Sequence, residues 1–312
     1  MAGRRLLTSC LVLLALGQLL WPAVSRAGGV AVLLSDAEAA YLAPLAAFKS
    51  EMPVPVRTFD LGGRLDRAPQ VMAELLASEP QLVFALGAKA AAVAKAWTSE
   101  RPDLPVLFAL VLNWQRYSLG GQANVAGIAQ DVSPGVQFAS ATLVRAGVRR
   151  LGVLYNPTFS AETVAAAQGE AQALGLQLVA RPLADPARFR QELRRLAEEV
   201  DALWVLPDPM LYSLEHLALM ETECVRRRLP CVGPSRQAAS AGLLLALDVD
   251  ETGVGYQAAA LARDLLAGRA TPAAIGVRPP LATRSVLNLR TAREMGLKLD
   301  PAVMGLTSEI ID

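Results

Sequence analysis

The chain has 312 residues, of which 53% are hydrophobic and 19% charged, and its formal net charge is +1. This length fits about two domains of 100–200 residues each. The near-neutral charge excludes the strongly basic surface that is typical of nucleic-acid-binding proteins.

The first 27 residues have the three-part layout of a secretory signal. Arg4 and Arg5 precede an apolar run over residues 6–20, and the small residues Ser25 and Ala27 are placed for cleavage after Ala27. The sequence therefore predicts export, with a signal peptide over residues 1–27; a retained membrane anchor is the alternative. The mature chain would keep 27 basic and 29 acidic residues, a net charge of about −2.

Short apolar runs alternate with helical patterns along the mature chain. In the first half, strands are expected at residues 30–34, 54–59, 82–86, 105–112 and 124–128. In the second half, they are expected at residues 151–155, 176–180, 202–206, 230–233 and 243–247. Helices are expected between them, for example one that is capped by Ser160 and runs to Leu174. This alternation predicts parallel sheets with helices on both faces, and its restart midway predicts two similar α/β lobes.

Polar residues and a glycine turn follow many of these strands. They are Ser35, Asp36, Gly87, Lys89 and Asn113 in the first half and Tyr155, Asn156, Asp208 and Ser235 in the second. Ligands of open parallel sheets bind at the carboxyl ends of the strands, so these residues are candidate ligand contacts. Because Ser, Asn and Asp also serve as helix caps and turn residues, a purely structural role is the alternative for each one.

No catalytic or metal-binding pattern stands out. The sequence has no GxSxG elbow, no phosphate-binding loop and no HExxH motif, and its single histidine, His216, lies within an expected helix. Cys224 and Cys231 are the only cysteines of the mature chain; a disulfide between them is possible in an oxidising compartment, and a metal site is not expected. We therefore expect a protein without cofactor, metal or enzymatic activity.

Several short segments together carry a family resemblance. They are residues 84–90, 105–108, 124–128, 152–155, 203–208, 229–233 and 288–292, with Leu297. In their order and spacing, the chain resembles the ABC-transporter substrate-binding proteins of the type I periplasmic-binding fold, in the group that includes tryptophan- and tyrosine-binding members. The resemblance covers nearly all of the mature chain.

The resemblance implies two doubly wound αβα lobes joined by a multi-stranded hinge, with a ligand held between them. From the family's three hinge crossings, expected near Asp131, Ala241 and Val277, the first lobe would comprise residues 28–130 and 242–276. The second would comprise residues 131–241 and 277–312. The resemblance also implies a periplasmic monomer that passes a small molecule to an ABC permease.

The expected binding mode places ligand contacts in both lobes. Gly87, Ala88 and Lys89 would receive a carboxylate of an anionic or zwitterionic ligand through backbone N–H groups and the lysine charge. Asp208 would accept a hydrogen bond from an amine or hydroxyl of the ligand, and Ser35 and Ser235 would bind it from opposite lobes.

The chain departs from the family pattern at two ligand-facing places. Family members usually have Thr or Ser followed by Pro at Gly87-Ala88, and often Asp-Pro at Asn113-Trp114. These departures argue against a simple transfer of an aromatic amino-acid ligand. Trp114 either stacks on the ligand or covers the hinge. A sensory module that signals to a membrane kinase or chemoreceptor is the alternative function.

Overall fold

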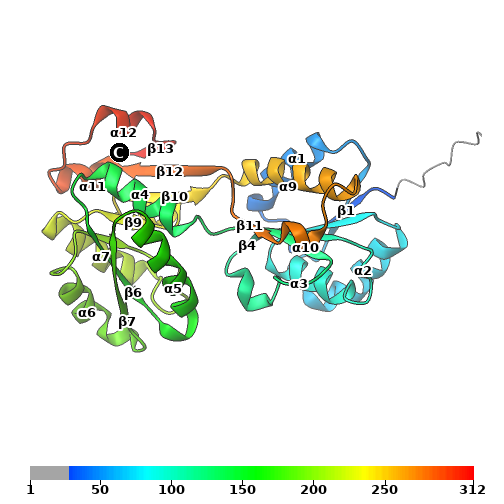
Figure 1. Ribbon diagram of the computed structural model, residues 1–312, viewed down its shortest axis with the longest axis horizontal. Helices are drawn as coiled ribbons and strands as arrows, with labels where there is room; N and C mark the ends of the chain where they lie inside the picture. The colour runs from blue at the N-terminus through cyan, green and yellow to red at the C-terminus, as the bar shows by residue number, and fades with distance from the viewer. Residues whose placement is uncertain (1–27) are drawn as a thin grey trace, which may run out of the picture.

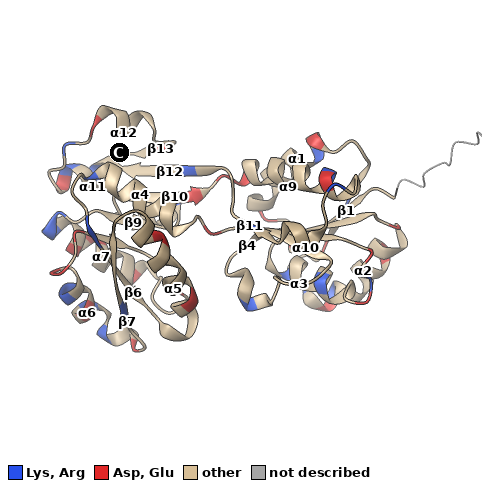
Figure 2. Cartoon of the chain, viewed as in Figure 1, with Lys and Arg blue, Asp and Glu red and all other residues tan. Residues whose placement is uncertain are grey.

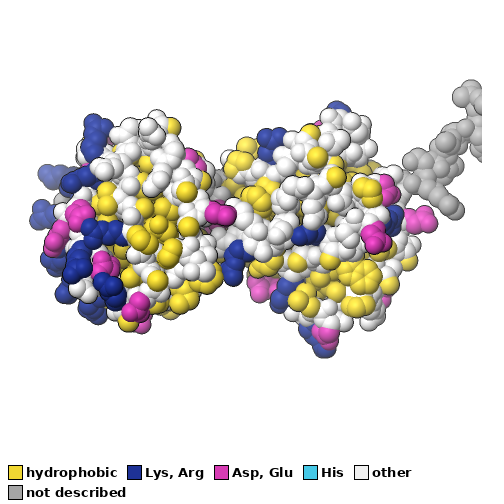
Figure 3. Space-filling model, turned by 60° about the horizontal axis from the view of Figure 1, so that its bottom comes forward, with side chains coloured by type: hydrophobic (Ala, Val, Ile, Leu, Met, Phe, Trp, Pro, Cys, Tyr) yellow, Lys and Arg dark blue, Asp and Glu magenta, His cyan; other side chains and the backbone are white. Residues whose placement is uncertain are grey.

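The apolar runs form two separate sheets in the computed structural model, which describes residues 28–312 (Figure 1). The expected signal peptide, residues 1–27, lies outside the described residues. Each sheet is the centre of one lobe, and the two lobes meet at a narrow waist (Figure 3).

The first lobe is built on a six-stranded sheet in the order β11-β5-β4-β3-β1-β2, and its pairings are parallel. The strands are β1 (Val30–Leu34), β2 (Val56–Asp60), β3 (Leu82–Leu86), β4 (Val106–Val111), β5 (Val125–Ala129) and β11 (Val277–Arg278). Every residue of β1, β3 and β4 is buried. Such strands read as continuous apolar runs because helices cover both faces of the sheet.

Two pairs of helices provide that cover. Side chains of β1 and β3 that alternate along the strand pack on α1 (Ala39–Glu51) and α9 (Glu251–Leu266) on one face, and on α2 (Ala68–Ala77) and α3 (Ala88–Trp97) on the other. Shorter elements complete the lobe. These are η1 (Leu65–Arg67), η2 (Trp114–Tyr117) and α10 (Pro272–Ile275).

The second lobe is built on a seven-stranded sheet in the order β13-β12-β10-β9-β8-β6-β7. The strands are β6 (Arg150–Tyr155), β7 (Gln177–Pro182), β8 (Ala202–Trp204), β9 (Cys231–Gly233), β10 (Leu245–Val249), β12 (Thr283–Asn288) and β13 (Glu309–Ile311). The β10–β12 pairing is antiparallel and the others are parallel.

Helices again cover both faces of this sheet. Buried residues of α4 (Pro134–Val144) and α5 (Pro157–Ala173) pack on one face, and those of α6 (Phe189–Leu196) and α7 (Leu214–Arg227) pack on the other. The remaining elements are η3 (Pro186–Arg188), α8 (Arg236–Ser240), α11 (Leu289–Glu294) and α12 (Pro301–Gly305). The prediction of two doubly wound α/β lobes is confirmed.

The chain passes between the lobes three times, and two of these crossings lie beyond the expected positions. The first crossing joins β5 to α4 around Asp131. The expected boundary near Ala241 would have put β10 in the first lobe, but β10 pairs with β9, so the chain crosses at Asp250. The boundary near Val277 would have put β11 in the second lobe, but β11 pairs with β5, so the third crossing spans residues 279–282.

Hydrogen bonds connect the second and third crossings. The backbone N–H of Asp250 donates to the Ala282 carbonyl over 3.1 Å. Gln257, on α9, donates to the Pro279 carbonyl and accepts from the Leu281 N–H, each over 2.9 Å. The two segments therefore act as one connection, beside the separate crossing at Asp131.

Two further features concern the cysteines and the length of the helices. A disulfide joins Cys224 at the end of α7 to Cys231 at the start of β9, which answers the question that the sequence left open. Within residues 28–312, no helix combines the length and the apolar character that a membrane crossing requires.

Candidate ligand-binding site

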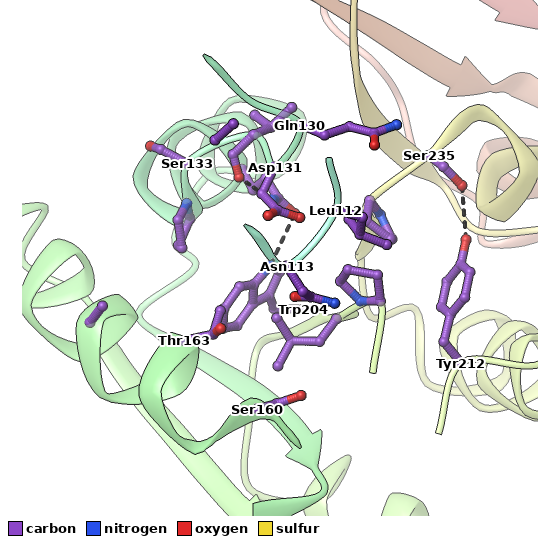
Figure 4. A pocket seen from close by; sticks show the side chains of 18 of the residues that line it. Leu112, Asn113, Gln130, Asp131, Ser133, Ser160, Thr163, Trp204, Tyr212 and Ser235 are labelled. Carbon is purple, nitrogen blue, oxygen red and sulfur yellow. Dashed lines mark hydrogen bonds between the residues drawn. The ribbon is translucent and has the colours of Figure 1, made fainter. Parts of the chain in front are cut away.

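A cavity of about 430 Å³ lies at the junction of the two lobes (Figure 4). Its walls come from the segments that follow β4 and β5 in the first lobe, from those that follow β8 and β9 in the second, and from α5. The carboxyl ends of parallel strands therefore meet at one place, as expected for a binding site of this fold class.

The first-lobe wall is the segment from Leu112 to Gln115, at the start of η2. Asn113 has a left-handed backbone with φ +50°, and Leu110 (φ +56°) and Ser118 (φ +49°) flank it in the same region. Left-handed residues other than glycine cost free energy and concentrate at ligand clamps and switch regions. The Trp114 ring lies so close to Gly120 that a Cβ there would meet it, which fixes the fold of this turn.

A contact between the lobes borders the same wall. The Arg116 guanidinium lies 5.5 Å from the centre of the Phe159 ring, on α5 of the second lobe. Lys95, on α3, donates to the Tyr117 carbonyl over 3.0 Å and holds η2 to its own lobe. η2 is thus an arm of the first lobe that contacts the second.

Asp131, on the first crossing, contributes a carboxylate to the cavity. It accepts a hydrogen bond from the backbone N–H of Asn113 (Figure 4). Burial raises the pKa of Asp131, and this hydrogen bond offsets only part of the rise.

The second-lobe wall contains Trp204, Tyr212 and Ser235. The Trp204 indole N–H donates to the Gln137 side chain over 3.0 Å, and its ring packs edge-on against Phe138. The hydroxyls of Tyr212 and Ser235 are 2.8 Å apart (Figure 4). Ser235 also caps α8 by accepting from the Ala238 N–H.

Asp208 does not face the cavity, in contrast to the expectation that it accepts from the ligand. Its side chain is buried and accepts from the Asn156 N–H over 2.8 Å, the Ser160 hydroxyl over 2.6 Å and the N–H groups of Met210 and Leu211. Four donors from the protein occupy both carboxylate oxygens, so its role is structural.

The side chains at the end of the neighbouring strand β6 also have structural roles. Asn156 caps α5 by accepting from the Thr158 N–H over 2.9 Å, because Pro157 occupies the first position of the helix. Ser160, expected as the cap, instead lies in the first turns of α5 and donates to Asp208. Tyr155 packs against the core.

The residues expected to bind the carboxylate form a cluster at the ends of β1 and β3, outside the cavity lining. The Ser35 hydroxyl accepts from the Ala90 N–H over 3.0 Å, so one amide at the start of α3 is already occupied. Lys89 donates to the Gly63 carbonyl over 2.8 Å. Gly87 has φ +86°, and a side chain there would collide with the hydroxyls of Ser35 and Tyr41.

The structure thus brings three of the eleven predicted residues together around the cavity. These are Asn113, Trp114 and Ser235. Ser35, Asp36, Gly87, Ala88 and Lys89 form the separate first-lobe cluster, and Tyr155, Asn156 and Asp208 are structural. Sequence reasoning missed Asp131, Trp204 and Tyr212 as cavity residues. Asp131 could have been found, because it follows β5 by two positions as Asn113 follows β4.

Comparisons with known proteins agree with this architecture. Residues 62–311 match the family model described as ABC transporter substrate binding protein. No curated protein sequence matches the chain.

Solved structures resemble nearly the whole chain. A domain from Streptococcus pneumonia in complex with L-Trp has a TM-score of 0.56 at 19% identity, covering 90% of this chain and 100% of its own. The ligand-free, open structure of a substrate binding protein with adhesive properties from Clostridium difficile has a TM-score of 0.74 at 16% identity, covering 91% and 99%. A conserved domain protein from Vibrio cholerae has a TM-score of 0.57 at 19% identity, covering 90% and 99%. At these identities the likeness shows the fold, which is the type I periplasmic-binding fold.

Proposed function

The chain belongs to the family of ABC transporter substrate-binding proteins, and from this membership we propose that it captures a small carboxylate-bearing solute between its lobes in the periplasm. Hinge bending would close the lobes around the solute, and the closed form would deliver it to the permease. The family assigns a solute-binding role, a small-molecule ligand and a transporter partner; the carboxylate, the compartment and a monomeric state are parts of the proposal.

One observation carries the proposal: the cavity lies where both lobes and the first hinge crossing meet. Its volume of about 430 Å³ falls within the roughly 300–1,000 Å³ of small-molecule sites. A ligand that contacts both lobes gains contacts on closure, and such differential contact shifts an open–closed equilibrium.

The carboxylate would be bound by the first-lobe cluster around Lys89, which lies at the carboxyl edge of the same sheet as Asn113 but outside the present cavity. Closure would bring this cluster towards the ligand. The Lys89 ammonium, now bonded to the Gly63 carbonyl, supplies the positive charge, and the N–H groups of Ala88 and Lys89 at the start of α3 supply further donors.

Export is supported by the signal-like sequence of residues 1–27 and by the disulfide, since disulfides persist in oxidising compartments such as the periplasm. Recovery of the protein from the periplasmic fraction with Gly28 as its first residue tests this part of the proposal. Recovery from the cytoplasm with residues 1–27 intact would contradict it.

A thermal-shift screen of amino acids, other carboxylates and small sugars tests the binding role. A solute at 100 times its Kd stabilises the folded state by about 2.7 kcal/mol, which raises the unfolding midpoint measurably. Small-angle scattering of the protein with its tightest-binding solute should then show a smaller radius of gyration than that of the ligand-free protein. A folded protein that no solute stabilises at millimolar concentration would contradict the proposal.

A further inference from the structure

We propose that Asp131 receives a positively charged nitrogen of the ligand, so that the solutes of this protein are molecules that carry a protonated amine or guanidinium group. This inference rests on the proposed solute-binding function and specifies its ligand. The positive charge of the ligand would then be bound at the first hinge crossing, and its carboxylate at the first-lobe cluster around Lys89.

The charges around the cavity have one sign. The acidic residues of its lining are Asp131, Glu162, Glu170 and Asp248, and none of the described residues that line it is Lys, Arg or His. By contrast, basic residues gather on the outer side of the second lobe, on α6 and α7 (Figure 2). An anionic solute would therefore enter a cavity that offers it no positive side chain.

Two of the four carboxylates bind groups of their own lobe, and a third is exposed to solvent. Glu170 accepts from the Gly135 N–H over 2.6 Å and from the Ser133 hydroxyl over 3.1 Å, which joins α5 to the start of α4. Asp248 accepts from the N–H groups of Arg236 and Val249. Glu162 is exposed to solvent.

Asp131 differs from these three. It is partly buried, its bond from Asn113 engages one donor, and no ion pair within residues 28–312 includes it. A carboxylate that is withdrawn from water without a cation is costly in free energy, and a cationic ligand group would remove that cost.

The surroundings of Asp131 suit an organic cation. Trp114 and Trp204 line the same cavity, and aromatic rings attract ammonium and guanidinium groups. The nearby first-lobe cations are engaged elsewhere, since Arg116 lies over Phe159 and Lys95 donates to the Tyr117 carbonyl. A ligand nitrogen would thus be the charge partner that Asp131 lacks.

Matched sets of solutes test the inference by calorimetry. Each set contains an amino acid, the amine without its carboxylate and the acid without its amine, such as tryptophan, tryptamine and indole-3-propionate, or leucine, isopentylamine and 4-methylpentanoate; arginine, agmatine and glucose complete the panel. We expect every binder to carry the protonated nitrogen, and the matching acids to bind at least 30-fold more weakly. Tight binding of an acid would overturn the inference while the proposed function stands. Tight binding of glucose would overturn the inference and the carboxylate part of the proposed function, and would leave the solute-binding role standing. If no solute of the panel or of the wider screen binds, both fall.

Asp131→Asn provides the second readout, because the amide keeps the size of the side chain and can still accept from Asn113. We expect the affinity for the amine-bearing solute to fall roughly 10- to 100-fold. The ligand-free unfolding midpoint should stay unchanged or rise, because an uncompensated charge has been removed. The matched control is Glu74→Gln, which removes one exposed acid on α2 and should leave the affinity within twofold. Equal affinities of Asp131→Asn and wild type would overturn the inference.

Discussion

The two lobes have the same strand order at their centres and use the polar residues at their strand ends in opposite ways. In the first lobe, Lys89 is exposed and donates to the Gly63 carbonyl, whereas Ser35 is buried between the Ala90 N–H and the Tyr41 hydroxyl. In the second lobe, Asp208 and Asn156 are enclosed by donors and acceptors of their own lobe. The first edge thus keeps one charged group, the Lys89 ammonium, exposed to a ligand, whereas the second edge uses its polar groups to hold its loops.

Carboxylates that follow strands differ in their number of hydrogen-bond partners. This number distinguishes a carboxylate that holds its own lobe together from one that can bind a ligand. Within the part of the chain that the structure describes, Asp208 accepts from four donors and Asp131 from one. A saturated buried carboxylate stabilises the fold, whereas one that still lacks partners gains free energy from a ligand. Substitutions that affect stability alone or binding alone can therefore test the comparison.

Asp208→Ala should have the largest effect, on stability. It leaves the buried Asn156 N–H and Ser160 hydroxyl without their acceptor and releases the turn at Met210 and Leu211, so we expect a loss of about 3–5 kcal/mol of unfolding free energy. Urea denaturation measures it, with Asp185→Ala, which removes one exposed bond to Ala187, as the control for losing a single turn contact. A stable Asp208→Ala variant that no longer binds solute would restore the ligand role expected from the sequence.

Lys89→Ala should show the reverse pattern. The side chain is exposed and makes one hydrogen bond to Gly63, so the unfolding free energy should change by less than about 0.5 kcal/mol. Loss of a charged hydrogen bond to the ligand carboxylate should weaken binding by about 1.5–3 kcal/mol. Titration calorimetry of a carboxylate-bearing solute measures it, and Lys49→Ala, an exposed lysine on α1, is the control. Equal binding by Lys89→Ala and wild type would mean that closure does not bring this cluster to the ligand.

The sequence predicts the sheets well because strands buried on both faces must be continuously apolar. β1 and β3 match their expected bounds residue for residue. The two residues of β11 carry no pattern of their own, and their pairing with β5 depends on the path of the chain after α9. The hinge boundaries near Ala241 and Val277 therefore differed from the observed crossings, since the pairing of β10 and β11 decides which lobe each belongs to.

The site is harder to predict, because residue type does not tell whether a polar group faces a ligand or its own backbone. Asp208 and Asp131 both follow apolar strands, but Asp208 alone meets four donors among the described residues, two from the turn after it and two from Asn156 and Ser160 at the start of α5. Trp204 resembles a core residue within a strand, since it is 3% exposed, yet it lines the cavity. These roles depend on tertiary packing, which no local pattern encodes.

Glu223 extends the comparison to a buried carboxylate that has cationic partners. It lies on α7 and pairs with Arg194, Arg226 and Arg227. Burial alone would raise the pKa of Glu223, but hydrogen bonds from Arg226 and Arg194 outweigh it and lower the pKa. Among residues 28–312, Asp131 has no such partner, and burial raises its pKa.

The two groups should therefore affect stability with opposite signs as pH changes. Glu223 stabilises the fold above its unfolded pKa of about 4.3, and this is lost as pH falls through its lower folded pKa. Glu223→Gln should cost about 1–2 kcal/mol at pH 7, and the cost should shrink below about pH 4. For Asp131, the free energy of unfolding falls as pH rises from the unfolded pKa of about 3.9 through the raised folded pKa. Asp131→Asn should remove that fall. Urea titrations from pH 3 to 7 measure the unfolding free energy of both variants. If its difference from wild type changes with pH in the same direction in both, the opposite signs expected for Glu223 and Asp131 are wrong.

Arg116→Ala should have the smallest effect, on the orientation of the lobes rather than on the stability of either one. The Arg116–Phe159 contact is exposed, and a cation–π contact of this kind contributes about 0.5–1 kcal/mol. Because it joins η2 of the first lobe to α5 of the second, its loss should broaden the distribution of lobe separations in the ligand-free protein. Distances between spin labels on α2 and α6 measure this distribution. Arg116→Lys should retain the narrow distribution, since the ammonium keeps the cation beside the ring, whereas unchanged distances in Arg116→Ala would show that the three crossings alone set the open angle.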